Sequence, residues 1–217
     1  MNIKAVLFDM DGVLVHSEHI MKEAAKRALA QWGVTARDED FVPFVGAGED
    51  KFVGGVAEKH GVPYDLAMKA KAYEIYLQLL EKEDIGYEGV KQTLMSLKEQ
   101  GYQLAVCSSA DEIKVSANLR AIDCAQGIFD YVVSGDRVPN KKPAPDLFLN
   151  AMRALEMEST DCVVIEDALN GIQAARAAEM HVIGITTYFD KQTLLNENPD
   201  AVCGDIRDIV AIIGKEQ

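Results

Sequence analysis

Two aspartates separated by one residue, Asp9 and Asp11, follow a short apolar run near the start of the chain. At the end of a buried strand, two such carboxylates repel each other unless a cation or a proton holds them together. Mg²⁺ is the expected cation, because it takes carboxylate and carbonyl oxygens and keeps positions open for water and a phosphate oxygen. One carboxylate can attack phosphorus, while the other protonates a leaving alcohol and later activates water. The spacing therefore indicates metal-assisted phosphoryl chemistry.

Further polar side chains stand where later strands are expected to end or the next helices to begin. They are Ser108, Ser109, Lys141, Lys142, Glu166 and Asp167. In a doubly wound sheet, ligands bind outside the carboxyl ends of the strands, so these residues are expected at one edge. Ser108 and Lys142 would supply a hydrogen bond and a positive charge to phosphoryl oxygens. Asp167, together with Glu166, would complete the acidic metal site.

Each of these residues also has an ordinary structural interpretation. Aspartate is common in turns, and Ser108 can N-cap the helix that follows it. Lys142 can be a solvated loop lysine. Glu166 and Asp167 suit the first turn of a helix, where the helix dipole favours acids. What favours chemistry is the joint pattern, because it places carboxylates, a hydroxyl and a lysine at the same expected edge.

The elements that must position these residues alternate between strands and helices. Nearly continuous apolar runs predict buried strands at Ile3–Phe8, Gln103–Cys107, Tyr131–Ser134, Cys162–Ile165, His181–Ile185 and Ala201–Cys203. The segments between most of them have the apolar spacing of amphipathic helices. Strands that alternate with helices predict an α/β fold built on a doubly wound parallel sheet.

The strand signal disappears between about residues 17 and 84. Helical patterns replace it at Ser17–Trp32, Glu49–Lys59 and Tyr64–Lys82. Ser17 stands where it can N-cap the first of these helices. We therefore predict two domains: an α/β core of residues 1–15 and 86–217, and an inserted helical cap of residues 16–85.

The composition is that of a globular protein that folds alone. Of the 217 residues, 48% are hydrophobic and 26% are charged. The formal net charge is −13, and no basic run is present, so nucleic acid is not an expected partner. Because an acidic protein repels anions at long range, a phosphate site must draw its positive charge from nearby lysines, backbone N–H groups or a metal.

The cysteines and the apolar runs indicate a cytoplasmic protein without a membrane partner. The four cysteines lack zinc-ligand spacing and are expected to be reduced core thiols. The run from Ala5 to Phe8 is interrupted by acids, unlike a signal peptide. No stretch approaches the roughly 20 apolar residues that span a bilayer. The oligomeric state cannot be inferred from the sequence.

The motifs resemble those of the haloacid dehalogenase-like hydrolase superfamily, in its beta-phosphoglucomutase-like branch with a helical cap. The matching strings are F-D-M-D-G-V-L-V-H-S-E, V-C-S-S, K-K-P-A-P-D and V-V-I-E-D-A-L-N-G-I, in this order over nearly the whole chain. The resemblance implies that Asp9 is the nucleophile and Asp11 the acid/base, with the Asp11 backbone carbonyl as a metal ligand. It also implies that Ser108 is the hydroxyl of the second motif and Lys142 the lysine of the third. Glu166 and Asp167 would be the acids of the metal site.

The cap differs from that of the mutases in this branch. Those enzymes carry a Lys-Gly-x-x-Arg-like element and an early cap histidine, which help to hold a doubly phosphorylated sugar. Here residues 45–49 read V-G-A-G-E, and Met21 stands at the histidine position. The resemblance thus favours a phosphatase that hydrolyses small phosphorylated metabolites, sugar phosphates in particular. Ser109, Gly46 and Lys51 are predicted to contact the substrate.

Several alternatives stay open at this point. The main one is a sugar-phosphate mutase on the same scaffold, and the glycines near Gly46 can simply form a turn that enters a cap helix. Dehalogenation has no leaving alcohol and so no use for Asp11. A phosphonate-cleaving relative would need a cap lysine as Schiff-base former. A signalling receiver domain is shorter and takes its phosphate after a middle strand. A non-catalytic binding protein would not need the complete motif set.

Overall fold

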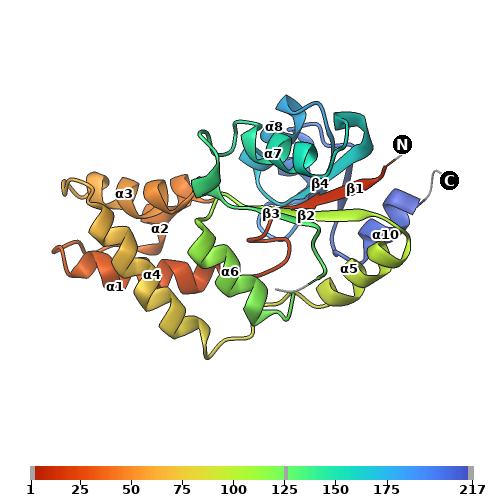
Figure 1. The fold of residues 1–217 in the computed structure, drawn as a ribbon. Helices are drawn as coiled ribbons and strands as arrows, with labels where there is room; N and C mark the ends of the chain where they lie inside the picture. Colours follow the sequence, from red (N-terminus) through yellow and green to blue (C-terminus); the bar gives the residue numbers. More distant parts are fainter. Residues whose placement is uncertain (1–2, 125–126, 215–217) are drawn as a thin grey trace.

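The computed structural model describes residues 3–124 and 127–214. Within these ranges, six parallel strands form one sheet in the order β3-β2-β1-β4-β5-β6 (Figure 1). The strands are β1 (Ala5–Phe8), β2 (Gln103–Cys107), β3 (Tyr131–Val133), β4 (Cys162–Glu166), β5 (His181–Ile185) and β6 (Ala201–Cys203). The predicted α/β fold with a doubly wound parallel sheet is therefore confirmed, and the strands lie close to their expected bounds.

The central strand, β1, explains why its sequence is a continuous apolar run. It lies between β2 and β4, with Leu7 in register with Ala105 on one side and Val164 on the other. Side chains alternate along a strand, so Phe8 joins the core on one face of the sheet and Leu7 joins the core on the other. A strand buried on both faces needs apolar residues at every position.

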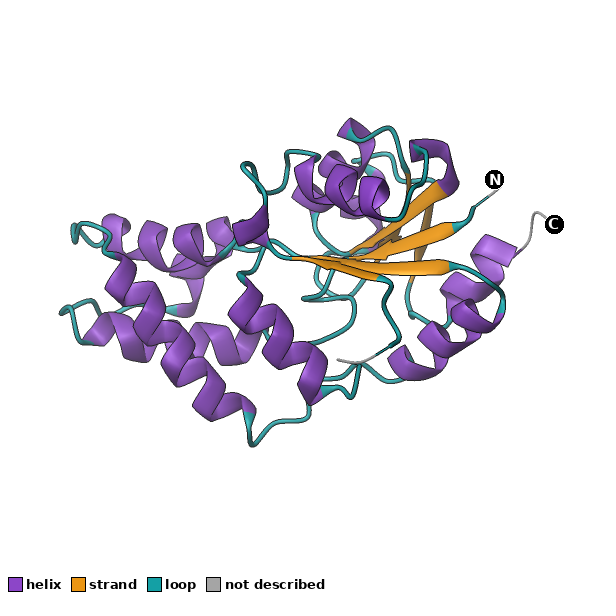
Figure 2. Ribbon diagram, viewed as in Figure 1, coloured by secondary structure: helices purple, strands orange, loops and turns teal. Residues whose placement is uncertain are grey.

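Helices cover both faces of this sheet (Figure 2). One face packs against α5 (Val90–Glu99) and α10 (Asp208–Ile213). The other face packs against α7 (Asp146–Ala154), α8 (Leu169–Ala177) and α9 (Lys191–Leu195). In α7, the side chains Leu147, Phe148 and Ala151 share one helix face and are fully buried. Burial of a phenylalanine of this kind stabilises the fold by roughly 1.5–3 kcal/mol.

Between β1 and α5 the chain forms a group of helices, which we call the cap. It consists of α1 (Glu18–Ala30), α2 (Asp38–Phe41), the 3₁₀ turn η1 (Val42–Phe44), α3 (Glu49–Lys59) and α4 (Leu66–Leu80). The cap lies beyond the carboxyl ends of the strands, and α1 packs along α4 (Figure 1). The three predicted cap helices are confirmed, whereas α2 was not expected. The exact residue limits of the two domains stay a prediction.

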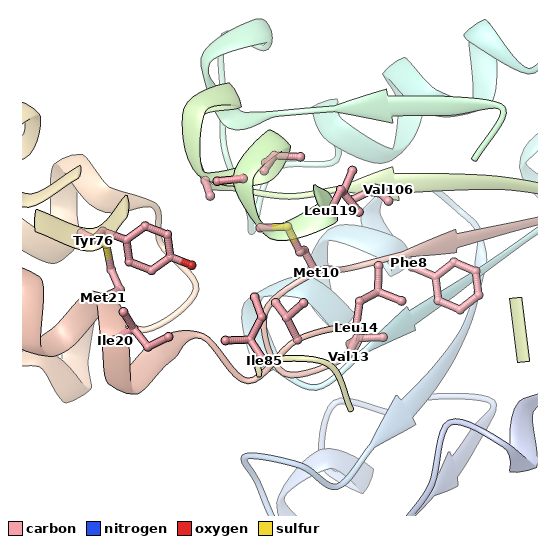
Figure 3. Packing of buried hydrophobic residues seen from close by; sticks show 14 of the residues in the cluster. Phe8, Met10, Val13, Leu14, Ile20, Met21, Tyr76, Ile85, Val106 and Leu119 are labelled. Carbon is pink, nitrogen blue, oxygen red and sulfur yellow. The ribbon is translucent and has the colours of Figure 1, made fainter. Parts of the chain in front are cut away.

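One apolar cluster runs from the sheet into the cap, so the two parts share a core. Figure 3 shows Phe8 and Met10 at the sheet end of this cluster, and Ile20 and Tyr76 at its cap end. All four side chains are buried. The cap is therefore packed against the carboxyl edge of the sheet, which is the edge where the predicted site residues lie.

The remaining elements complete the connection between core and cap. Helix α6 follows β2 and contacts α4 of the cap, and short 3₁₀ turns precede α7 and β4. Their bounds are α6 (Glu112–Ala121), η2 (Gly135–Arg137) and η3 (Ser159–Asp161). All four cysteines are buried with free thiols, in agreement with the prediction of core thiols. No helix in residues 3–124 or 127–214 is both long and apolar enough to cross a bilayer.

Candidate active site

Three carboxylates meet at the carboxyl ends of β1 and β4. Asp9 follows β1, Glu166 ends β4 and Asp167 comes next. One carboxylate oxygen from each lies within 4.8 Å of the others. Burial raises the pKa of Asp9 to about 7; the positive charge of Lys142 opposes this rise, and the negative charge of Glu166 adds to it. Burial, followed by the charge of Glu166, also raises the pKa of Asp167 well above its usual value.

This cluster has the properties of a divalent cation site. Its donors are carboxylate oxygens, the ligands that Mg²⁺ prefers. A bound cation would relieve the repulsion that adds to burial in raising the pKa values of Asp9 and Asp167. The backbone at Gly12 lies very close to the Asp167 carboxylate, because a Cβ at Gly12 would be 1.8 Å from Asp167 Oδ2. Gly12 also has a positive φ of +84. Only glycine suits this position. Thr187, which the sequence did not indicate, donates a hydrogen bond to the Gly12 carbonyl.

Lys142 is a buried member of the site rather than a solvated loop residue. Its side chain is 2% exposed, and its ammonium donates hydrogen bonds to Asp9 and Glu166. Burial opposes the charged form, but these two carboxylates raise the pKa of Lys142 above its usual value. The alternative structural interpretation of this lysine is therefore wrong, and a permanent positive charge lies beside Asp9.

The two serines after β2 are also buried and both face a cavity. Ser108 Oγ accepts a hydrogen bond of 3.1 Å from the Ala110 N–H, which leaves its own proton free to donate. Helix α6 begins at Glu112, with Asp111 at the N-cap position, so Ser108 does not cap it. Ser109 Oγ is buried without a hydrogen-bond partner among the described residues.

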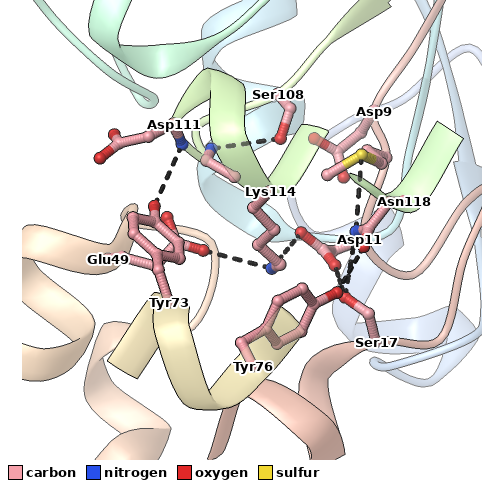
Figure 4. A network of polar contacts seen from close by, with 12 residues as sticks. Asp9, Asp11, Ser17, Glu49, Tyr73, Tyr76, Ser108, Asp111, Lys114 and Asn118 are labelled. Atoms are coloured by element: carbon pink, nitrogen blue, oxygen red, sulfur yellow. Dashed lines mark hydrogen bonds and ion pairs between the residues drawn. The ribbon is translucent and has the colours of Figure 1, made fainter. Parts of the chain in front are cut away.

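Asp11 lies in a polar network between core and cap (Figure 4). Ser17 donates a hydrogen bond to Asp11 Oδ1, and Lys114 Nζ lies 2.7 Å from Asp11 Oδ2. Ser17 stands at the N-cap position of α1, as expected, but its side chain makes no capping hydrogen bond there. Lys114 and its neighbour Asn118, which donates to Ser17 Oγ at 3.3 Å, were not predicted as site residues from the sequence. Two polar residues four positions apart on the buried face of a helix were the available signal.

A cavity of about 360 Å³ joins these groups and lies between part of the cap and the sheet edge. It is lined by Asp9, Asp11, Gly46, Ser108, Ser109, Lys142, Glu166 and Asp167. Lys51 is not among the lining residues and is exposed. Asn170 of the core donates a hydrogen bond of 3.0 Å to the Gly46 carbonyl, which holds the cap loop over the cavity. His16 and His19, whose rings stack 5.8 Å apart, also line it, although the sequence did not indicate that His16 belongs to a cluster.

The chain is similar to known proteins over most of its length. The family model described as haloacid dehalogenase-like hydrolase matches residues 6–185. The phosphoglycolate phosphatase of Nitrosospira multiformis is 31% identical in an alignment that covers 98% of this chain and 96% of the relative. Among solved structures, CbbY from Rhodobacter sphaeroides in complex with phosphate has a TM-score of 0.85 and 26% identity, covering 95% of this chain and 96% of that one.

A plant relative is more similar in sequence but much longer. The protein SUPPRESSOR OF QUENCHING 1, chloroplastic, of Arabidopsis thaliana is 45% identical over 212 residues, or 95% of this chain. The chain spans only 20% of that relative's length, so the alignment concerns one part of a larger protein.

Proposed function

Because the chain belongs to the haloacid dehalogenase-like hydrolase family, we propose that it is a Mg²⁺-dependent phosphatase of small phosphorylated metabolites, sugar phosphates in particular. The observation that carries this proposal is the convergence of a carboxylate cluster, a buried lysine and two buried serines on one cavity. Relatives that are named phosphatases support the assignment as a phosphoric monoester hydrolase. A cytoplasmic location stays a prediction.

In the first proposed step, a carboxylate oxygen of Asp9 attacks phosphorus and forms an aspartyl-phosphate. The bond from phosphorus to the alcohol oxygen breaks, and that oxygen takes a proton from the carboxyl of Asp11. Lys142 and the free proton of Ser108 stabilise the phosphoryl oxygens. The unpartnered Ser109 hydroxyl is a further donor to the substrate.

In the second step, Asp11 acts as a base. Its carboxylate takes a proton from water, the water oxygen attacks phosphorus, and the bond to Asp9 breaks. The products are inorganic phosphate and the free Asp9 carboxylate. Ser17 and Lys114, which each contact one oxygen of Asp11, hold its side chain in place for both proton transfers.

The proposed Mg²⁺ ligands are the side chains of Asp9 and Asp167 and the backbone carbonyl of Asp11, with Glu166 bound directly or through water. When bound, the ion neutralises charge on the phosphoryl oxygens and on the clustered carboxylates.

The reaction class is tested with sugar monophosphates, followed by phosphorus NMR. We expect release of inorganic phosphate, with little conversion of β-glucose 1-phosphate to glucose 6-phosphate even when glucose 1,6-bisphosphate is added. A mutase must retain a bisphosphate intermediate, and Glu49 provides a negative charge in the cap instead of a positive one. Accumulation of glucose 6-phosphate without phosphate release would favour the mutase alternative.

Metal removal tests the cofactor. Excess chelator should abolish turnover, and Mg²⁺ should restore it. Because the pKa of Asp9 is raised to about 7 without a metal, its carboxyl must lose a proton before it binds the ion. Mg²⁺ affinity should therefore increase as the pH rises from 6 to 8, by up to about tenfold for each pH unit below that pKa. Titration calorimetry at the two pH values measures this change. Full activity in excess chelator would contradict the proposed metal dependence.

A further inference from the structure

Glu49, the first residue of α3, is a buried carboxylate on the acid/base side of the cavity. It is 5% exposed, and it lines the cavity. Its Oε1 lies 3.2 Å from Lys114 Nζ, which in turn lies 2.7 Å from Asp11 Oδ2 (Figure 4). Since Asp11 is the proposed proton donor to the leaving oxygen, Glu49 and Lys114 lie where the leaving group of a substrate has to fit.

Lys114 has no unshared charge to offer an anionic leaving group. Its ammonium lies between Asp11 and Glu49, and 5.8 Å from the ring centroid of Tyr76. Its burial opposes the charged form, but the two carboxylates raise the pKa of Lys114 above its usual value. Lys142 is shared in the same way between other carboxylates, as described above. Both buried lysines of the cavity are therefore already neutralised by protein groups.

The third lysine that lines the cavity, Lys22, has an acid one turn away on its own helix. It follows Glu18 by four residues, which is one turn of α1. Burial raises the pKa of Glu18, and the positive charge of Lys22 opposes this rise, so the two charges act on each other. Part of the remaining wall is apolar and includes Met21, Phe44 and Phe52.

One oxygen of Glu49 also remains available as an acceptor. Oε2 is buried and has no hydrogen-bond partner among the described residues. The phenol of Tyr73 lies beside it (Figure 4), and burial together with the Glu49 charge raises the pKa of this phenol. The Tyr73 hydroxyl can thus donate to Oε2, while the Glu49 carboxylate, which lines the cavity, can accept from a ligand hydroxyl there. A carboxylate or phosphate dianion on the ligand has no proton to donate, and Glu49 would repel it strongly in this buried site.

We propose that the Glu49–Lys114 pair makes the enzyme select phosphate esters whose leaving alcohol is neutral and carries hydroxyls. Esters whose leaving group bears a carboxylate or a second phosphate are rejected. This inference rests on the proposed phosphatase function and narrows its substrate class. It predicts that the chain differs from the relative named phosphoglycolate phosphatase, because the leaving group of phosphoglycolate is glycolate, which bears a carboxylate.

The test compares 2-hydroxyethyl phosphate with phosphoglycolate, which differ only in an alcohol in place of a carboxylate. We expect kcat/KM of the wild type to favour 2-hydroxyethyl phosphate by at least about tenfold, since like charges at a binding site are costly. Glu49→Gln should reduce this preference to less than about threefold, chiefly by lowering KM for phosphoglycolate. Glu49→Asp, which keeps the charge, should retain it. Glu58→Gln, the same change on an exposed position of α3, should behave as wild type.

A binding measurement separates this inference from the proposed function. In an Asp9→Asn background with Mg²⁺ present, calorimetry should show the preference as a ratio of Kd values for the two esters, and Glu49→Gln in that background should reduce this ratio. If the wild type hydrolyses neither ester nor p-nitrophenyl phosphate, the phosphatase proposal fails, and the Kd ratio still decides the inference. Equal affinity for the two esters, or a preference that Glu49→Gln leaves intact in a folded variant, would overturn it.

Discussion

Asp9→Asn should lower phosphatase turnover by at least about 10⁴-fold, the scale seen when a catalytic nucleophile is removed. The amide has the shape of the carboxylate but cannot form the aspartyl-phosphate. The substitution should not unfold the protein. Burial raises the pKa of Asp9, which means that its charged form is unfavourable at this position, and a neutral amide avoids that cost. Lys142 also keeps Glu166 as a partner.

The measurement is the steady-state rate with Mg²⁺ in excess, together with a thermal unfolding curve. Asp123→Asn is a matched control, because Asp123 is exposed and has a positive φ of 56 that asparagine tolerates. This control should retain the wild-type rate. Wild-type turnover by folded Asp9→Asn protein would show that another group attacks phosphorus.

Asp11→Asn should reduce turnover of sugar phosphates by about 10²–10⁴-fold, the usual contribution of general acid–base catalysis. The amide cannot give a proton to the leaving alcohol or take one from water. Formation of the aspartyl-phosphate from p-nitrophenyl phosphate should suffer much less, because p-nitrophenolate leaves readily without a proton.

Rapid-mixing measurements of p-nitrophenol release distinguish the two steps. In Asp11→Asn protein we expect a fast burst of one equivalent, followed by a slow phase limited by hydrolysis of the intermediate. The substitution leaves Lys114 paired with Glu49, and unfolding curves check that the fold is retained. An equal loss in the burst and in the slow phase would argue against a specific role of Asp11 in proton transfer.

The sequence by itself determined the sheet and the residues at its carboxyl edge. The run at β1 is apolar at each position because the strand is buried on both faces, and that requirement is visible without coordinates. In a parallel sheet all strands end on the same side, so Asp9, Ser108 and Glu166 had to come to one edge once their strands were recognised. The short helix α2 was missed, because four residues are too few to show a helical period.

Only the tertiary structure decided which side chains hold the acid/base residue Asp11 and that Glu49 of the cap lies near it. Asp11, Lys114 and Glu49 come from the loop after β1, from α6 and from α3, so no local spacing relates them. The same holds for Ser17, which suits an N-cap by residue type but donates to Asp11 instead. These contacts depend on how the cap packs against the sheet edge, and that packing is set by apolar side chains distant in the chain.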